Sequence, residues 1–563
     1  MSTATATEKT PDTSKISSAQ VEAREINGMD GVIPTKDGTI YVSKPYRSSY
    51  SKKLKSVVTF VPRTTLIEAS NFNEFRGFYS LFWISLFIFA VRTYVRSIEK
   101  SGRPLNYVFA NMMSQDALTL AISDAVLVLS TGLCVPFAKA ISKGWINYYW
   151  TGVFIQHIFQ TSVVYIAVKW TFNRQWPWVQ SGFLTIHSLT MLMKMHSYMN
   201  TNGYLQWVSQ HTKELLVQLR NETSRVGDSS TDAGTPPIGT PPLQDGSVVH
   251  RSYLDGPTAI ALRNRLKAVA QPASSGDGSP RPASPSSDGS DHDKLQGAIP
   301  HPLVDHPDEV VAALATEYSE LDAELVSTGP EYVRWPENIT LKNFAVYQLI
   351  PTLVYELEYP RTNRIRPMYI FEKTVATFGT FALLYTITET FIIPLTPRPD
   401  QSFAKSLLDL SMPFMIAYLL LFYIIFECIC NGFAELSYFA DRRFYEDWWN
   451  STSWDEFSRK WNKPVHSFLL RHVYASTIKS YRLSRSSAMF ITFFISALAH
   501  ELVMAVVTHK IRMYLFALQL IQIPLIAVGR IPAIKRNKKL GNVVFWLGLY
   551  AGFPLLCVAY VAY

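Results

Sequence analysis

A histidine lies inside an apolar run that is long enough to cross a membrane. His500 and Glu501 interrupt the run SSAMFITFFISALAHELVMAVVT at 486–508. If the helix begins near Arg485 at the membrane surface, His500 lies about 15 residues in, or ~22 Å deep. An ionisable side chain at that depth costs several kcal/mol unless it has a partner or a function. A neutral imidazole there can act as a general base towards a hydroxyl, and a purely structural role is the alternative.

Two polar residues precede His500 on the same face of this expected helix. Ser496 is four residues before His500, and Arg485 is eleven residues before Ser496, which is close to three full turns. A stripe of cation, hydroxyl and imidazole suits a ligand with an anionic head outside the membrane and a reactive group inside it, such as acyl-CoA. A snorkelling arginine and a serine bonded to its own helix backbone explain the same stripe equally well.

A second motif lies between two apolar runs. FYEDWWN, at 444–450, places four aromatic residues, two acids and an amide in seven positions. It belongs to a segment, 431–485, that is too polar to span a membrane and too aromatic for a loose loop. Tryptophans at this density indicate helices that lie at the membrane interface. The segment also offers hydrogen-bond donors near the expected head-group site, namely Asn450, His466, Arg471, His472 and Tyr474.

The elements that must position these residues are apolar runs. A membrane span needs about 20 consecutive, mostly apolar residues. The runs that qualify are 78–97, 116–138, 148–170, 178–199, 368–394, 406–430, 486–508, 511–529 and 542–563. We therefore expect an all-α, polytopic membrane protein with about nine transmembrane helices. Helices one to four fall within 71–210, and helices five to nine fall within 336–563.

Polar segments flank and divide the two groups of spans. Residues 1–70 are expected to form a cytosolic tail that is largely disordered. Residues 211–335 form a cytosolic linker, and its centre at about 226–308 is rich in Pro, Gly, Ser and Asp. This composition buries too little apolar surface to fold, so the centre is expected to be a disordered insert. All four cysteines lie in apolar runs, which argues against a disulfide framework and against a zinc site.

The distribution of lysine and arginine predicts the orientation. Basic residues cluster at 52–63 and at 530–539, whereas the loop between spans five and six has Arg398 alone. The positive-inside rule then places the N-terminus in the cytosol, together with the segment 431–485. The glycosylation sequons at Asn221, Asn338 and Asn450 would face the cytosol and remain unmodified.

Several blocks of this sequence resemble a known enzyme family. They are FYEDWWN, RKWNKPVHSFLLRHVY (459–474), SALAHE (496–501), MKMHSYMNTNGYL (193–205) and PTLVYELEYPRTNRIRPMYIFEK (351–373). The chain resembles the sterol O-acyltransferase branch of the membrane-bound O-acyltransferase family, and most of all the fungal sterol-esterification enzymes. The resemblance covers roughly 70–210 and 335–563. Diacylglycerol O-acyltransferases share FYxDWWN and the intramembrane histidine, so the motifs specify acyl transfer better than they specify the acceptor.

The resemblance implies a reaction chamber enclosed by nine helices, with an acyl-CoA tunnel from the cytosol and a lateral entrance for the lipid acceptor. His500 would be the catalytic base and Asn450 its partner in the chamber. The acyl-CoA contacts implied in the same way are Ser496, Arg485, His466 and Tyr474, and Trp449 would line the chamber. The family position of Arg485 can carry lysine, which leaves its phosphate contact open.

The resemblance also implies the reaction. A long-chain acyl group would pass directly from acyl-CoA to the sterol 3-hydroxyl, giving steryl esters for storage. No metal and no cofactor besides the co-substrate acyl-CoA is expected, and no nucleic-acid partner. The family implies an endoplasmic reticulum membrane location and a homo-oligomer, either a dimer or a pair of dimers. The remaining ionisable residues in or beside spans could line the chamber, but structural roles are expected for them, least of all for His196, which lies in a family-like block. They are His157, His187, His196, Asp409 and Glu427.

Two alternatives remain at this point. Diacylglycerol or another lipid alcohol would be esterified by the same chemistry. A lipid transporter or channel is the alternative from another class, but the sequence has no sign of the inverted halves found in many transporters.

Overall fold

The structure is a computed structural model that describes residues 31–35, 38–42, 76–102, 111–112, 114–232, 301–327, 333–395, 401–529, 531–532 and 537–562. Strands β1 (Gly31–Thr35) and β2 (Gly38–Val42) form an antiparallel hairpin in which Val32 pairs with Tyr41. This hairpin lies within the tail that was expected to be largely disordered, and it was not predicted. The other elements of the described chain are helices, so the expected all-α class is confirmed for the membrane part.

Six helical stretches are long and apolar enough to cross a membrane, and each overlaps a predicted span. They are built from α5 (Ala117–Ser130), η1 (Thr131–Leu133) and α6 (Cys134–Ser142); η2 (Tyr148–Gly152) and α7 (Val153–Arg174); α12 (Pro367–Ile387) and η5 (Thr388–Ile392); α13 (Phe403–Phe422), η6 (Tyr423–Ile429) and α14 (Cys430–Leu436); α18 (Arg485–Thr508); and α21 (Lys538–Ala562). The chain is therefore a polytopic helical membrane protein.

The other three predicted spans are also helical but differ from the expectation in length or polarity. The first coincides with α3 (Arg76–Ser101), and the eighth coincides with α19 (Tyr514–Gly529), which has 16 residues. A straight helix of that length is shorter than the hydrocarbon core of a bilayer. The fourth is the beginning of α8 (Trp178–Asp232), a helix of 55 residues that continues well beyond the predicted end near 199.

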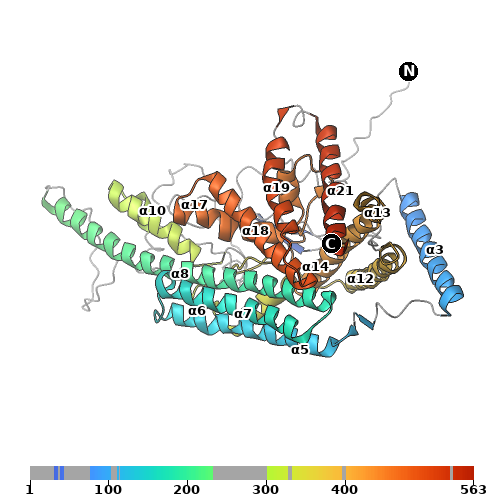
Figure 1. Ribbon diagram of the computed structural model, residues 1–563. Helices are drawn as coiled ribbons and strands as arrows, with labels where there is room; N and C mark the ends of the chain where they lie inside the picture. The colour runs from blue at the N-terminus through green and yellow to red at the C-terminus, as the bar shows by residue number, and fades with distance from the viewer. Residues whose placement is uncertain are drawn as a thin grey trace, which may run out of the picture.

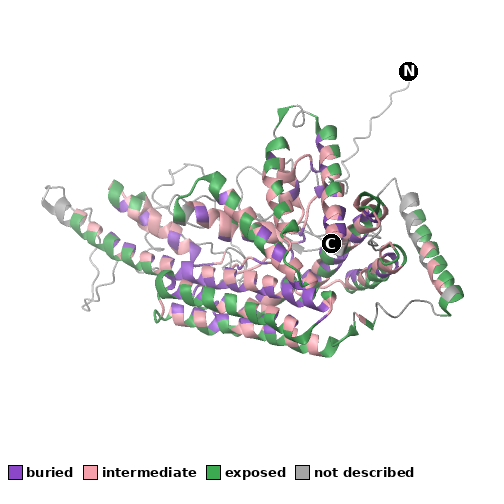
Figure 2. Ribbon diagram, viewed as in Figure 1, coloured by how far each residue is buried: buried purple, intermediate pink, exposed green. Residues whose placement is uncertain are grey.

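Helix α8 runs through the middle of the molecule, with α5, α6 and α7 beside it (Figure 1), and buried residues concentrate along it (Figure 2). Its buried face carries polar side chains among the apolar ones. Lys194, for example, donates to the carbonyl oxygens of Tyr347 and Ile350 at 2.8 and 2.9 Å, at the end of α11 (Leu341–Leu349). Polar groups so buried must be hydrogen-bonded. The first part of α8 is therefore a central helix held by protein contacts.

The C-terminal part of α8 forms an arm with α10 (Glu309–Glu324), which lies along it (Figure 1). Leu219, Val311 and Ala315 form a small buried core here, against which Val226 and Val304 pack. The helical turn η4 (Pro302–Asp305) completes the arm. Helix α8 extends into the first residues of the predicted insert at about 226–308, and η4 lies near its end, where Val226 and Val304 pack on this core. The centre of the insert, 233–300, lies outside the described residues.

Short helices fill the segment between α14 and α18. They are η7 (Trp448–Asn450), α15 (Trp454–Lys460), α16 (Lys463–Phe468), η8 (Leu469–Tyr474) and α17 (Ala475–Tyr481). Ser453 accepts a hydrogen bond from the Glu456 backbone at the start of α15, and Asn462 does the same for Val465 in α16. Such side-chain caps satisfy backbone donors that a helix start leaves free. They explain why so polar a segment is ordered.

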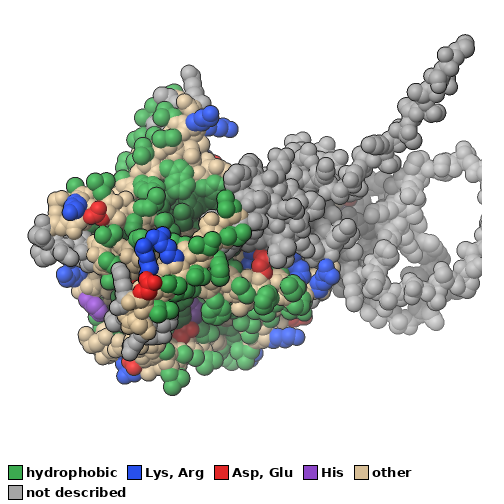
Figure 3. All heavy atoms as spheres, turned by 90° about the vertical axis from the view of Figure 1, so that its right-hand side faces the viewer, with side chains coloured by type: hydrophobic (Ala, Val, Ile, Leu, Met, Phe, Trp, Pro, Cys, Tyr) green, Lys and Arg blue, Asp and Glu red, His purple; other side chains and the backbone are tan. Residues whose placement is uncertain are grey.

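The outer surface is largely apolar. Figure 3 shows hydrophobic side chains over a large part of the described surface on one face, with small groups of charged side chains between them. Leu118, Phe378 and Leu408 are more than two-thirds exposed on α5, α12 and α13. A soluble protein rarely exposes apolar patches of this extent, whereas a lipid-facing surface requires them.

Candidate active site

His500 is held by its own helix in one defined protonation pattern. Its Nδ1 lies 2.7 Å from the carbonyl oxygen of Ser496 and 3.5 Å from the Ser496 hydroxyl. A carbonyl oxygen can only accept a hydrogen bond, so Nδ1 carries the hydrogen and Nε2 of the neutral ring keeps its lone pair. The side chain is exposed on α18. Nε2 is therefore the ring nitrogen that is left to accept a proton.

The neighbouring Glu501 has a structural task. Its carboxylate accepts hydrogen bonds from the backbone nitrogens of Met513, at 2.7 Å, and Phe516, at 3.1 Å, around the first turn of α19. The Tyr560 hydroxyl on α21 donates to the same carboxylate at 3.1 Å. A carboxylate at a helix start satisfies free N–H groups and favours the helix dipole. Glu501 thus joins α18 to α19 and α21 directly beside His500.

The FYEDWWN segment is anchored by its aromatic rings. Trp448 is only 1% exposed and packs against Phe422, Trp461 and Trp546, whose ring centroids lie 4.8 to 5.8 Å away. Trp449 remains 42% exposed. Trp448 therefore belongs to the hydrophobic core, while Trp449 presents its ring at the surface of the segment.

Helix α21 approaches this segment closely. A Cβ atom at Gly541 would lie 2.8 Å from the Thr452 carbonyl oxygen, and one at Gly548 would lie 2.8 Å from the Trp454 ring. Asn542 and Trp546 on α21 also donate hydrogen bonds to the Trp449 carbonyl oxygen, at 2.9 and 3.1 Å. Two glycines and two donors on α21 thus fix the turn that carries Asn450.

The two acids of FYEDWWN are paired with lysines. Glu446 bonds Lys463, and one carboxylate oxygen of Asp447 lies 2.8 Å from the Lys460 ammonium. The other Asp447 oxygen accepts a hydrogen bond of 3.4 Å from the Asn450 amide nitrogen. The hydrogen bond from Lys460 holds the pKa of the Asp447 carboxyl below its ordinary value. Asp447 is therefore anionic at neutral pH and orients Asn450.

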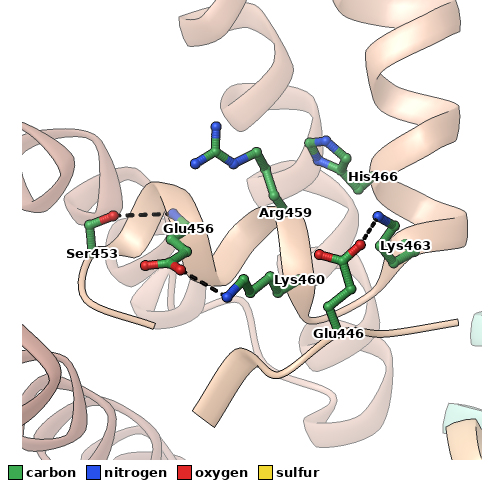
Figure 4. A pocket seen from close by; sticks show the side chains of 7 residues that line it. All are labelled: Glu446, Ser453, Glu456, Arg459, Lys460, Lys463 and His466. Atoms are coloured by element: carbon green, nitrogen blue, oxygen red, sulfur yellow. Dashed lines mark hydrogen bonds and ion pairs between the residues drawn. The ribbon is translucent and has the colours of Figure 1, made fainter. Parts of the chain in front are cut away.

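These lysines line a pocket of about 340 Å³ beside the motif (Figure 4). The residues around it are Glu446, Ser453, Glu456, Arg459, Lys460, Lys463 and His466. Burial, with smaller contributions from the charges of Lys463 and Arg459, lowers the pKa of His466 below its ordinary value. His466 is accordingly neutral at physiological pH, and the cations of the pocket are Arg459, Lys460 and Lys463, each of which is paired with a carboxylate.

Comparison with known proteins places the chain in a family. Residues 323–562 match the family model of MBOAT, the membrane-bound O-acyltransferase family. The chain is 32% identical over 537 residues to a probable sterol O-acyltransferase 1 of Schizosaccharomyces pombe, covering 93% of this chain and 88% of the relative. The chain belongs to the membrane-bound O-acyltransferase family. As a member of this family it is an acyltransferase.

Two further relatives match very different shares of this chain. Sterol O-acyltransferase 2 of Candida albicans is 30% identical over 536 residues, which cover 92% of this chain and 80% of the relative. Diacylglycerol O-acyltransferase 1 of Dictyostelium discoideum is 33% identical over 234 residues, which cover 40% of this chain and 37% of the relative. The resemblance to sterol O-acyltransferases therefore extends over most of this membrane-bound O-acyltransferase.

The structure of this membrane-bound O-acyltransferase brings only some of the predicted site residues together. Ser496 lies against His500, as their spacing indicated. Arg485 is exposed at the first position of α18, where the helix was expected to begin, and Tyr474 is half-buried on η8. No hydrogen bond joins Asn450 to His500 in the part of the chain that the structure describes.

The remaining ionisable residues of the acyltransferase that were expected to be structural have polar partners or ring contacts. His187 bonds Asp124, and the Gln156 amide nitrogen lies 3.0 Å from His196. The rings of His157 and His196 lie 6.0 Å apart. Asp409 accepts a hydrogen bond from Gln401, and Glu427 pairs with Lys373 at 2.9 Å and accepts from the Tyr445 hydroxyl.

Sequence reasoning missed a buried charge cluster that includes Arg442, two residues before FYEDWWN. Glu435, which is fully buried, pairs with Arg366 at 3.0 Å and with Arg442 at 2.9 Å. Arg366 is 69 residues from Glu435 in sequence, so no spacing rule points to the pair. The pocket residues Arg459, Lys460 and Lys463 were also missed, although the Glu456–Lys460 spacing of four residues is a recognisable helical ion pair.

Proposed function

We propose that this acyltransferase transfers a long-chain acyl group from acyl-CoA to the 3-hydroxyl of a sterol, giving a steryl ester and CoA. The observation that carries the proposal is the extent of the resemblance. Relatives named sterol O-acyltransferase match 93% and 92% of the chain, whereas the relative named diacylglycerol O-acyltransferase matches 40%.

In the proposed reaction, Nε2 of His500 accepts the proton of the sterol hydroxyl while the oxygen attacks the thioester carbonyl. The C–O bond forms, the C–S bond breaks, and the departing sulfur takes the proton back from the imidazolium. This cycle returns the neutral ring and balances without a covalent enzyme intermediate. The Nδ1 hydrogen bond to the Ser496 carbonyl supports the assignment, because it leaves the lone pair on Nε2.

Asn450 is proposed as the donor that stabilises the negative charge developing on the thioester carbonyl oxygen. Its amide nitrogen carries two hydrogens, and Asp447 accepts one of them. The second is available to the substrate. One such donor in a dry site contributes about 3 kcal/mol. Asn450 must approach His500 across the bound thioester, so the substrate itself would separate the two side chains.

The acyl-CoA is proposed to enter with its anionic head over the pocket beside FYEDWWN. Arg459, Lys460 and Lys463 supply positive charge there, and His466 supplies a neutral hydrogen-bonding ring. Arg485 and Tyr474 are proposed to contact CoA along the path to the thioester, with Ser496 next to the reacting carbonyl. The Trp449 ring, exposed beside Asn450, is proposed to line the chamber.

The cellular setting is proposed from the family and the charge pattern. We expect an endoplasmic reticulum membrane location with a cytosolic N-terminus, and assembly of identical chains. The basic stretch at 52–63 lies outside the described residues, while Lys538 and Lys539 begin α21. The buried amide of Asn338 donates to the Tyr355 hydroxyl at 2.9 Å, so this sequon is inaccessible in the folded chain whichever way it faces.

The acceptor is tested by supplying the purified protein, in lipid vesicles, with labelled oleoyl-CoA and either ergosterol, cholesterol or diacylglycerol. We expect labelled steryl ester and little triacylglycerol. Triacylglycerol as the sole labelled product would refute the sterol acceptor and would favour the alternative that the partial diacylglycerol acyltransferase match supports.

A further inference from the structure

The pocket and the turn that carries Asn450 share one side chain, Lys460. Its ammonium lies 2.8 Å from Asp447 and 2.8 Å from Glu456. Asp447 precedes the turn and bonds the Asn450 amide. Glu456 follows the turn, and its second oxygen accepts from the Thr452 backbone nitrogen at 2.8 Å and from the Thr452 hydroxyl at 3.0 Å. Lys460 is thus bonded to both ends of the turn.

Lys460 also lines the pocket, as Figure 4 shows for its bond to Glu456. An ammonium has three N–H groups, and Asp447 and Glu456 take two of them. Among the residues that the structure describes, Lys460 has no third hydrogen-bond acceptor. A phosphate oxygen in the pocket would take that position without displacing either carboxylate.

We propose that Lys460 and Asp447 transmit occupancy of the pocket by the phosphates of acyl-CoA to the orientation of Asn450. Asp447 is a positioning residue in this arrangement: it touches no substrate and acts through Asn450. A phosphate on Lys460 immobilises the ammonium, the ammonium immobilises the Asp447 carboxylate, and the carboxylate holds one Asn450 N–H so that the other points to the thioester. The inference rests on the proposed use of acyl-CoA and of Asn450 by this enzyme.

The consequence is that the phosphates contribute to kcat as well as to binding. Binding energy from a remote part of a substrate raises kcat only where it is used to organise the reacting centre. A donor without phosphates, oleoyl-pantetheine, should therefore react with a lower kcat at saturation. We expect the wild-type kcat to be about tenfold lower with this donor than with oleoyl-CoA.

The test compares the ratio of these two kcat values among variants. Asp447→Asn keeps the shape of the side chain but loses its charge, so it should lower kcat for oleoyl-CoA and bring the ratio to within about twofold. Lys460→Met removes the ammonium that bonds Asp447 and is proposed to bind the phosphate. This variant should also bring the ratio of the two kcat values to within about twofold. The matched control is Asp455→Asn, because Asp455 pairs with the pocket residue Arg459 at 3.0 Å but has no bond to the Asn450 turn. It should keep the wild-type ratio.

Thermal unfolding in detergent verifies that each variant is folded. A wild-type kcat that is equal for the two donors would overturn the proposal, and so would a wild-type ratio retained by folded Asp447→Asn or Lys460→Met protein. The ratio is measured with whichever acceptor the wild-type enzyme esterifies. The coupling can therefore fail while acyl transfer stands, whereas absence of any ester from oleoyl-CoA would refute the proposed function itself.

Discussion

Both side chains proposed to meet the substrate are oriented by bonds to near neighbours in sequence. His500 bonds the carbonyl of Ser496 one helical turn earlier, and Asn450 bonds Asp447 three residues earlier. Such local bonds persist when helices move relative to one another, because both partners move together. Each group can therefore keep its orientation while the surrounding helices adjust to a bulky lipid acceptor.

At the same scale, the lowered pKa of His466 leads to a prediction about pH. The ring is neutral near pH 7.5, so His466→Gln should change the apparent KM for oleoyl-CoA by less than about twofold there. A phosphate beside the ring favours its protonated form, so wild-type affinity should rise relative to the variant as the pH falls towards about 6. Initial rates at both pH values measure this. A tenfold increase in KM for the variant at the higher pH would show that His466 is already charged.

At the scale of elements, α18 is held where it carries the proposed base. Glu501 bonds the start of α19 and the Tyr560 hydroxyl of α21, and α21 in turn packs on the FYEDWWN segment through Gly541 and Gly548. The helices that bear His500 and Asn450 are therefore connected through α21, although the two side chains have no hydrogen bond with each other. This connection gives the acid next to the proposed base a structural role.

Removing the Glu501 carboxylate should weaken this connection. Glu501→Ala leaves two backbone N–H groups at the start of α19 and the Tyr560 hydroxyl without their acceptor. Loss of a helix cap costs about 1–2 kcal/mol, so the unfolding midpoint in detergent should fall. Glu501→Gln keeps one acceptor oxygen, so its unfolding midpoint should fall less than that of Glu501→Ala. Equal midpoints for the wild-type protein and the alanine variant would contradict the capping role.

At the scale of the whole molecule, the sequence predicts what depends on local composition and fails where contacts are distant. Apolar runs identify the spans, and spacing identifies the Ser496–His500 pair. Helix α8 continues to Asp232 and packs near Leu219 and Val226 against α10, which begins 77 residues after Asp232, so no periodicity in α8 reveals that partner. The Glu435 charge cluster was missed for the same reason, since its arginines come from separate segments.

Part of the candidate site could be predicted and part could not. The motif indicated Asn450 and the span indicated His500, but neither showed that Trp448 is buried in the core while Trp449 is exposed. Adjacent aromatic residues look alike in a sequence, and only the turn at η7 decides which ring faces inwards. The lysine partners of the two acids in FYEDWWN come from α15 and α16, and they are apparent only when these helices are placed beside the motif.

Sterol esterification with His500 as the base is tested by the rate at which purified wild-type and His500→Gln enzyme convert labelled oleoyl-CoA and a 3-hydroxysterol into steryl ester. We predict that kcat of the variant is lower by about 10²–10⁴-fold, because a general base contributes that much to the rate. The unfolding midpoint should be unchanged. His211→Gln, on the α8 arm, should retain wild-type activity. A folded His500→Gln enzyme that keeps more than about a tenth of the wild-type rate would contradict the account.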